Sequence, residues 1–360
     1  MMNYEEFKEH VADHIREYLP EDYGTSVVEL MDVVKNNDEV RSGLRITQED
    51  SNVSPTIYLG EFFEQYKDGA DMDSILSGIA EIRLGSNALN NFNVHQLTNL
   101  DQVKDKIQCK LIGLEANTKY LQDKPHMIKE DLAIVYNIEI ESTARGKMAT
   151  VITNGLMNEL RLNKEELHGI AMSNLMQSEP EFKSMRDILI ANMFPDGLDP
   201  DDPMANFLPP KEETPSMYVL TNKDSINGAT QILNDKLMSE IAEKVGGDFI
   251  ILPSSIHEVI ILPWAVGMER AELEAMIQDV NATQVSPEEE RLSDKPYSYD
   301  SKAHELMRMD KMEQMRDKIK SRERVSLKDK LAEKKQEVMG TEKARAQDSP
   351  KLKRAATALE

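Results

Sequence analysis

The sequence predicts an α+β fold in which helices and short-stranded sheets are mixed in two lobes, followed by a charged helical C-terminal tail. Three observations lead to this class. Apolar residues recur every three or four positions in several segments, which is typical of helices. Short runs rich in β-branched residues lie between turn residues, which is typical of strands. The balance of charge changes sign near residue 301, where the apolar content also falls.

Helical spacing is clearest at the N-terminus, where Phe7, Val11, Ile15 and Tyr18 are three or four residues apart and Pro20 ends the pattern. Further helices are expected over 62–66, 72–84, 164–175, 229–245 and 269–280. Strands are expected over 26–34, 40–48, 55–59, 107–112, 132–140, 148–152, 217–220, 249–252 and 256–262. The last two strands flank Pro253, Ser254 and Ser255, and this three-residue connection predicts a hairpin.

Four regions are predicted along the chain. An N-terminal α+β lobe covers 1–194, and a C-terminal α+β lobe with the hairpin covers 216–300. Between them, 195–215 reads as a linker, because its six prolines lack N–H donors and several aspartates accompany them. Residues 301–360 form the charged helical tail, and about the last fifteen have too little apolar content to fold.

Charge is unevenly distributed. The chain has a formal net charge of −22, but residues 301–360 hold 17 basic and 11 acidic residues, which leaves residues 1–300 at −28. An acidic body repels phosphate backbones, so it is not expected to bind nucleic acid directly. The longest apolar run, 259–268, is half of the ~20 residues that a membrane span needs. With one cysteine, Cys109, and no apparent secretory signal, the expected location is the cytoplasm, and Cys109 is expected to be a buried strand residue.

Two clusters invite a catalytic or metal-binding interpretation. His10 and His14 have the i, i+4 spacing of zinc ligands, but Val11 stands where a metalloprotease helix needs glutamate, so no metal is expected there. The second cluster has the residue types of a hydrolase triad. Neighbours in a strand point to opposite faces, so its histidine and glutamate are not expected to orient one another. It remains a candidate polar cluster made of Ser254, Ser255, His257 and Glu258, and no catalytic, cofactor or metal residue is predicted.

The tail carries a narrow apolar stripe at helical spacing. Methionine side chains adapt to irregular grooves, which suits a helix that docks onto a partner. We therefore expect Met309, Met312 and Ile319 to be docking anchors, with a solvated extension as the alternative.

Several stretches together resemble a known family. They include Pro55 to Leu59, Ala171 to Asn174, Asn227 to Ala229, Leu252 to Val259 and Val280 to Val285. The sequence over about 48–300 resembles the uncharacterised bacterial family called domain of unknown function 5688, and more loosely domain of unknown function 1444. Neither resemblance implies an activity or site residues. Residues 324–335 are similar to tails of proteins from conjugative elements, which implies an origin in mobile elements.

The function predicted from these observations is a non-catalytic protein-interaction module of mobile-element origin, with an unidentified protein partner. Two alternatives remain open. One is an acidic decoy that mimics DNA and binds a DNA-binding protein, which requires carboxylates along one face. The other is a hydrolase or metal-dependent enzyme, which requires a pocket with convergent polar groups at one of the two clusters.

Overall fold

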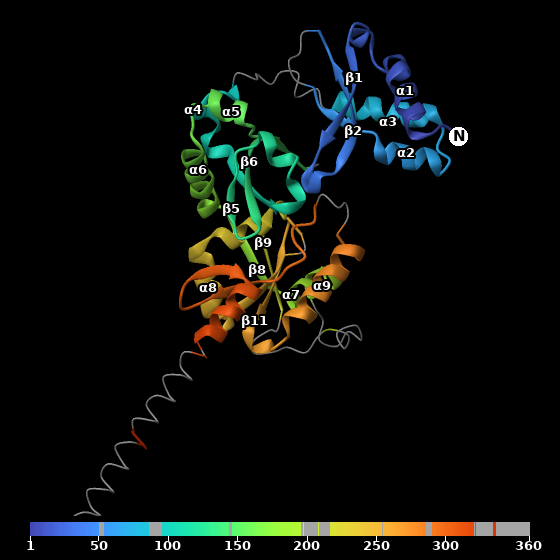
Figure 1. Cartoon of the computed structure of the whole chain (residues 1–360). Helices are drawn as coiled ribbons and strands as arrows, with labels where there is room; N and C mark the ends of the chain where they lie inside the picture. The colour runs from blue at the N-terminus through green and yellow to red at the C-terminus, as the bar shows by residue number, and fades with distance from the viewer. Residues whose placement is uncertain are drawn as a thin grey trace, which may run out of the picture. The chain divides into compact units, whose positions relative to one another are not determined.

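The computed structural model describes residues 1–49, 54–85, 96–143, 146–195, 197, 208, 217–253, 255–285, 290–319, 321 and 334–335. The chain divides into two compact units, Met1–Leu306 and Met307–Glu360. The mixture of helices and antiparallel sheets confirms the α+β class (Figure 1). Nearly all of the predicted linker, 195–215, lies outside the described residues, as does most of the chain after residue 321.

The N-terminal part of the first unit is a three-stranded antiparallel sheet packed on helices (Figure 1). The predicted first helix is confirmed, since the buried Phe7, Val11 and Ile15 all pack into one apolar cluster. The elements are α1 (Tyr4–His14), the 3-10 helix Ile15–Tyr18, β1 (Val27–Val34), β2 (Val40–Thr47), β3 (Thr56–Tyr58), α2 (Gly60–Lys67) and α3 (Met72–Gly85).

A second antiparallel sheet follows, in the order β4-β6-β5, with β7 paired to β6. Its strands are β4 (Ile107–Gly113), β5 (Met127–Lys129), β6 (Leu132–Thr143) and β7 (Gly146–Val151). Alternate residues of β6 enter different clusters: Ile134 and Tyr136 join the largest core, while Ala133 and Val135 pack on the opposite face. This alternation is the two-residue period of a strand that is covered on both faces.

The third sheet has six strands in the order β13-β12-β10-β11-β9-β8. They are β8 (Pro180–Ser184), β9 (Tyr218–Asn222), β10 (Phe249–Leu252), β11 (Val259–Pro263), β12 (Tyr297–Asp300) and β13 (Glu305–Arg308). Strand β8 precedes the predicted linker and β9 follows it, yet the two are paired from Pro180↔Asn222 to Ser184↔Tyr218. The sheet is therefore assembled from both sides of the 195–215 segment.

The remaining helices are α4 (Leu100–Val103), α5 (Asn154–Glu159), α6 (Lys164–Gln177), α7 (Met185–Met193), α8 (Asp235–Val245) and α9 (Arg270–Thr283). The continuous helix predicted over 229–245 is wrong. It is divided into a 3-10 helix, Gly228–Leu233, and α8, because the side chain of Asn234 accepts a hydrogen bond from Leu237 N (3.1 Å) and starts a new helix.

The predicted hairpin is present, but its connection is longer than expected. Strands β10 and β11 pair from Phe249↔Pro263 to Leu252↔Ile260, so the chain between the strands runs from Pro253 to Glu258. The prediction of a strand from 256 is therefore wrong, and His257 and Glu258 precede β11 instead of lying in it.

The β1–β2 hairpin is held to the second sheet through its tip. The backbone N–H of Asn37 donates to Asn117 Oδ1 (2.8 Å), and its side-chain Nδ2 donates to Arg291 O (3.0 Å). The carboxylate of Asp38 accepts from Lys119 N (2.9 Å) and Tyr120 N (2.8 Å). Burial raises the pKa of Asp38, but these two N–H groups and the Thr118 hydroxyl lower it by more, so the pKa lies below its ordinary value of 3.8.

We expect Asp38→Asn to lower the free energy of unfolding at pH 7 by about 1 kcal/mol, because hydrogen bonds to a charged acceptor are stronger than those to a neutral one. A carboxyl group whose pKa falls on folding stabilises the fold above its unfolded pKa and loses this contribution as pH falls. The difference from wild type should therefore shrink as pH falls below 3.8. Urea unfolding at pH 7, 5 and 3 measures it. The control is Asp279→Asn, which removes one exposed carboxylate elsewhere. A gap independent of pH would contradict the expected role of the charge.

Candidate functional site

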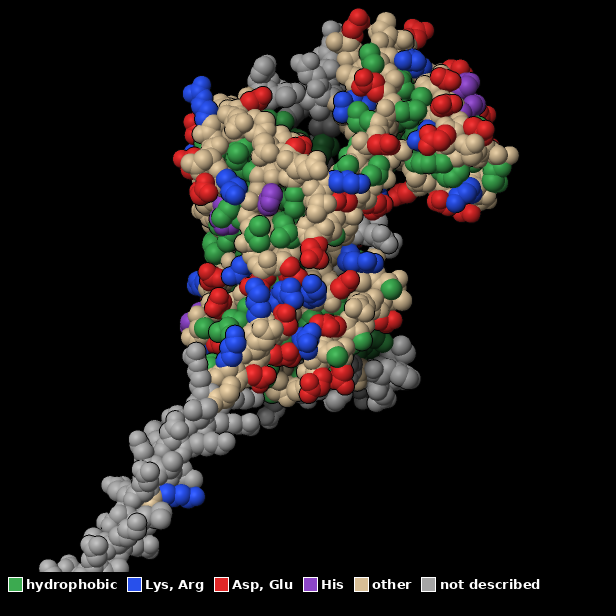
Figure 2. Space-filling model, in the orientation of Figure 1, with side chains coloured by type: hydrophobic (Ala, Val, Ile, Leu, Met, Phe, Trp, Pro, Cys, Tyr) green, Lys and Arg blue, Asp and Glu red, His purple; other side chains and the backbone are tan. Residues whose placement is uncertain are grey.

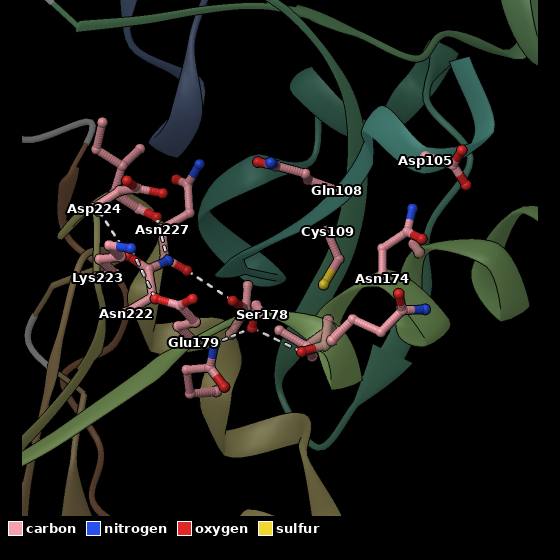
Figure 3. A pocket seen from close by; sticks show the side chains of 16 residues that line it. Asp105, Gln108, Cys109, Asn174, Ser178, Glu179, Asn222, Lys223, Asp224 and Asn227 are labelled. Atoms are coloured by element: carbon pink, nitrogen blue, oxygen red, sulfur yellow. Dashed lines mark hydrogen bonds and ion pairs between the residues drawn. The ribbon is translucent and has the colours of Figure 1, made fainter. Parts of the chain in front are cut away.

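A cavity of about 540 Å³ opens where β4, the C-terminal end of α6 and the segment from β9 to the 3-10 helix meet (Figure 3). Carboxamides are prominent in its lining, since they belong to six of the sixteen described residues around it. We call it the amide cavity. The six are Gln108, Asn174, Gln177, Asn222, Asn227 and Gln231.

Helix α6 provides one wall. The helix begins with a capping box, in which the Asn163 side chain accepts from Glu166 N (2.8 Å) and the Glu166 carboxylate accepts from Asn163 N (2.9 Å). The buried residues Leu167, Ala171 and Leu175 are four apart and pack into the largest core. This face fixes the rotation of the helix, so Asn174 and Ser178 line the cavity.

Asn174 has a fixed orientation within this wall. Its Nδ2 group donates to Lys104 O (2.7 Å) and to Ile107 O (2.8 Å), so both N–H bonds are used. The amide oxygen is consequently directed away from these two carbonyl groups and remains available as an acceptor.

The opposite wall is a tight turn after β9. The Asn222 side chain closes the turn by donating to Ile226 O (2.8 Å) and accepting from Ile226 N (3.2 Å). Asn227 has a left-handed backbone, with φ 54°. At Gly228 a Cβ atom would stand 2.2 Å from Thr221 Oγ1 and 2.4 Å from His257 O, so no larger residue fits without movement of the backbone. The wall therefore depends on the Asn227–Gly228 pair.

Gln231 links the two walls and is completely buried, with 0 % exposure. Its Nε2 group donates to Ser178 Oγ (2.8 Å), and Ser178 Oγ donates its hydrogen to Leu175 O (2.7 Å). The one hydrogen of the Ser178 hydroxyl is donated to Leu175 O, so Ser178 Oγ can only accept a hydrogen bond from Gln231. This requirement fixes the orientation of the Gln231 amide. The oxygen Oε1 of Gln231 has no hydrogen-bond partner among the described residues.

Charged side chains surround the cavity and are mostly acidic. Asp105, Glu179 and Asp224 are exposed carboxylates, and Lys223 is the single cation among the described lining residues. Lys223 Nζ lies 2.9 Å from Glu179 Oε2. This surplus of negative charge favours neutral and cationic ligands over anions.

Cys109 is a buried residue of β4, as predicted, with 5 % exposure at the cavity wall. Burial raises the pKa of its thiol to about 12, so the neutral thiol dominates near pH 7 and is a weak nucleophile. No histidine occurs among the described lining residues. Tyr136 and His168, which share a 3.0 Å hydrogen bond, do not line the cavity, and burial raises the pKa of Tyr136 and lowers that of His168. The described lining thus holds three carboxylates and a neutral thiol, but no histidine.

Two residues of the candidate polar cluster, Ser255 and His257, lie beside this cavity and support the turn that forms its wall. Ser255 Oγ accepts from His257 N (3.0 Å), and His257 Nδ1 accepts from Asn227 N (3.2 Å). His257 O accepts from the Thr221 hydroxyl (2.8 Å), and His257 Nε2 lies 3.6 Å from Glu290 Oε1. These contacts hold the Asn227–Gly228 turn. Ser254 lies outside the described residues, and Glu258 makes none of these contacts.

The two histidines of α1 stack on one another, with ring centroids 4.1 Å apart, and His14 Nδ1 contacts His10 O at 2.9 Å. Within the described ranges, no group of three or more His, Cys, Asp or Glu is placed to hold a metal ion. The absence of a metal at His10 and His14 stays a prediction.

In the second unit, the predicted anchors differ in exposure. Met309 is 3 % and Met312 is 1 % exposed, whereas Ile319 is 53 % exposed. Of the three, only Ile319 has an exposed side chain, and Met315 in the same helix is 45 % exposed. The docking role of the tail stays a prediction.

Sequence reasoning did not identify the cavity, although two signals were present. Ala171 to Asn174 and Asn227 to Ala229 carried the family resemblance, and both stretches contribute residues to the cavity. The pair Asn227-Gly228 is also a turn signal, because both residue types tolerate a left-handed backbone. Gln231 had no such signal, since it lay inside a predicted continuous helix.

Figure 2 shows one face of the molecule, on which Asp and Glu side chains are interspersed with Lys and Arg. A decoy of DNA requires a continuous acidic surface, and this face does not have one. None of the described helices combines the length and the apolar character needed to cross a membrane.

The observed class is thus an α+β protein with three antiparallel sheets in its described residues and an amide-lined cavity. The chain belongs to the family of unknown function DUF5688, whose model matches residues 4–301. The match confirms the predicted resemblance and extends it from residue 48 towards the N-terminus. The looser similarity to domain of unknown function 1444 stays a prediction. No curated protein matches the chain. No solved structure matches it.

Proposed function

We propose that this protein is a non-catalytic protein-interaction module, and that its amide cavity receives a short segment of a partner polypeptide. The cavity's volume, about 540 Å³, lies within the range of ligand-binding clefts. The observation that carries the proposal is the set of six carboxamides in the lining. Carboxamides form hydrogen bonds without acting as acid, base or nucleophile, which suits recognition of polar main-chain groups.

The charge of the body supports a neutral or basic partner. Residues 1–300 have a net charge of −28, and the cavity itself carries three carboxylates against one ammonium group among its described lining residues. This field attracts basic polypeptides and repels nucleic acid. The neutral Cys109 thiol and the supporting position of His257 argue against the hydrolase alternative.

Binding to an array of immobilised random twelve-residue peptides tests this function. The informative variant is Glu179→Lys with Asp224→Lys, which reverses two exposed charges of the cavity. We expect binding to basic peptides to weaken by about tenfold or more, because charges around a site set partner selection. The matched control is Glu81→Lys with Glu243→Lys, on α3 and α8, which changes the net charge equally without touching the lining.

Retention of binding in the control together with loss in the cavity variant supports the proposal. Equal loss in both variants would assign the attraction to overall charge and contradict a role of the cavity. Failure of the wild-type protein to bind any peptide of the array would overturn the function itself.

A further inference from the structure

We propose that the amide cavity recognises a guanidinium group, supplied by an arginine side chain of the bound segment. Only the source of the guanidinium rests on the proposed function, since the chemical argument concerns the cavity alone.

Three polar side chains of the walls, Asn174, Ser178 and Thr230, direct all their donors to the protein itself. Both N–H bonds of Asn174 go to the carbonyl groups of Lys104 and Ile107. The Thr230 hydroxyl donates to Asn227 O (2.8 Å), and the Ser178 hydroxyl donates to Leu175 O. Each of these side chains retains oxygen lone pairs, so the groups face a ligand as acceptors.

Gln231 holds an acceptor oxygen that has no partner among the described residues. It is fully buried, lines the cavity, and directs Nε2 to Ser178, so its Oε1 is an acceptor without a partner among the described residues. A buried acceptor that makes no hydrogen bond destabilises the fold. Oε1 is closed off from solvent, so the wall beside it must shift before a ligand N–H group can reach it. A bond formed in this way removes the penalty, and the cavity therefore favours donors.

Three other amides of the lining direct one N–H donor each to the protein. Gln108 Nε2 donates to Glu139 Oε2 (2.7 Å), and Gln177 Nε2 donates to Ser173 O (3.3 Å). The side-chain amide of Asn222 donates to Ile226 O and accepts from Ile226 N. Lys223 forms an ion pair with Glu179.

A guanidinium group is the protein side-chain group that matches this surface best. It carries five N–H donors and no acceptor, it stays charged at all physiological pH values, and it is less strongly hydrated than an ammonium group. Asp105, Glu179 and Asp224 supply counter-charge, while Cys109, Ala171 and Leu175 provide apolar contact for the methylene stem. Lysine has three donors at a single point, so it should bind more weakly.

Calorimetric titration of the full chain tests the inference. The probes are acetylated five-residue glycine peptides with a central arginine, lysine or citrulline, and free agmatine. Citrulline has nearly the shape of arginine but is neutral, and it replaces one NH2 group, with two N–H donors, by an acceptor oxygen. We expect the arginine peptide to bind at least about tenfold more tightly than the citrulline peptide, with lysine between them.

Two variants locate the binding. Gln231→Met keeps the length of the side chain and removes Oε1, so affinity for the arginine peptide should fall about tenfold. Its control is Gln177→Met, an exposed lining amide, which should stay within about twofold. If Gln231→Met does not fold, Asp105→Asn at the exposed edge replaces it, and the arginine-to-citrulline ratio of the wild-type protein remains decisive.

The outcomes separate this inference from the proposed function. Equal binding of arginine and citrulline peptides overturns guanidinium recognition but leaves peptide binding intact. Binding of agmatine without binding of any peptide supports guanidinium recognition and overturns the proposed function. Arginine-selective binding that Gln231→Met leaves unchanged places the site elsewhere and overturns the inference. Binding of none of the four probes overturns it as well.

Discussion

Replacing Gly228 with alanine is expected to lower the free energy of unfolding by about 3 kcal/mol and to abolish ligand binding at the amide cavity. The added Cβ atom would meet Thr221 Oγ1 at 2.2 Å, His257 O at 2.4 Å and Asn222 N at 2.8 Å. Two of these atoms belong to the backbone, so a side-chain rotation cannot relieve the overlap. The turn after β9 must open, and Asn227 then loses its position in the cavity wall.

Gly169→Ala is the matched control for this substitution. Gly169 is an exposed residue of α6, and a Cβ atom there meets nothing within 4 Å. Alanine is favoured over glycine inside a helix, so this variant should be more stable by about 0.5–1 kcal/mol. Urea unfolding followed by circular dichroism compares the two variants. An unchanged midpoint in Gly228→Ala would show that the turn tolerates a side chain and contradict the account of the wall.

Arg83→Ala is expected to lower the free energy of unfolding by about 3 kcal/mol or more. Arg83 is 0 % exposed within the N-terminal helices and sheet. Its Nε donates to Ile46 O (2.9 Å), and its guanidinium carbon lies 4.9 Å from the centre of the Tyr23 ring. Truncation leaves a cavity, removes the interaction with the ring and takes from Ile46 O one of its two side-chain donors, since Ser54 Oγ also donates to it (2.7 Å).

Arg83→Lys tests whether Arg83 stabilises the fold through the geometry of its guanidinium group or through its positive charge. Lysine retains the charge but lacks the planar group that donates to Ile46 O while lying over Tyr23, so we expect an intermediate loss. Thermal unfolding, followed by tyrosine fluorescence and by far-ultraviolet circular dichroism, gives the loss of stability of both variants. Equal stability of Arg83→Lys and wild type would show that the positive charge alone is required, and a neutral effect of Arg83→Ala would exclude a structural role.

The sequence identified elements whose apolar pattern is local. Phe7, Val11 and Ile15 lie on one helix face, and the β-branched run of β6 alternates between two cores, so both elements were predicted. Strands β5, β8, β12 and β13 were missed, because segments of three to five residues such as 180–184 and 297–300 contain charged or hydroxyl residues that are typical of loops. Their strand conformation depends on neighbours that are distant in the sequence.

The cavity could not be predicted for the same reason. Gln231 and Ser178 are 53 residues apart, and Asn174 contacts Lys104, which is 70 residues away. Each of these residues is common on solvated surfaces, and its role depends on which hydrogen-bond donors have been used by partners elsewhere in the chain. These contacts form only in the folded chain, whereas the turn at Asn227 and Gly228 is signalled by the local sequence.

The pairing of β8 with β9 has a consequence for dissecting the chain. Because β9 lies between β8 and β11, cutting the chain between Phe194 and Pro195 and keeping the C-terminal piece removes the outermost strand and turns β9 into an edge. Tyr218, Val219 and Leu220 are all less than 10 % exposed in the intact protein, so that edge would combine unpaired backbone groups with apolar side chains. Edges of this kind promote strand-to-strand aggregation. A soluble C-terminal fragment should therefore begin at or before Pro180, so that it keeps the strand that protects the sheet.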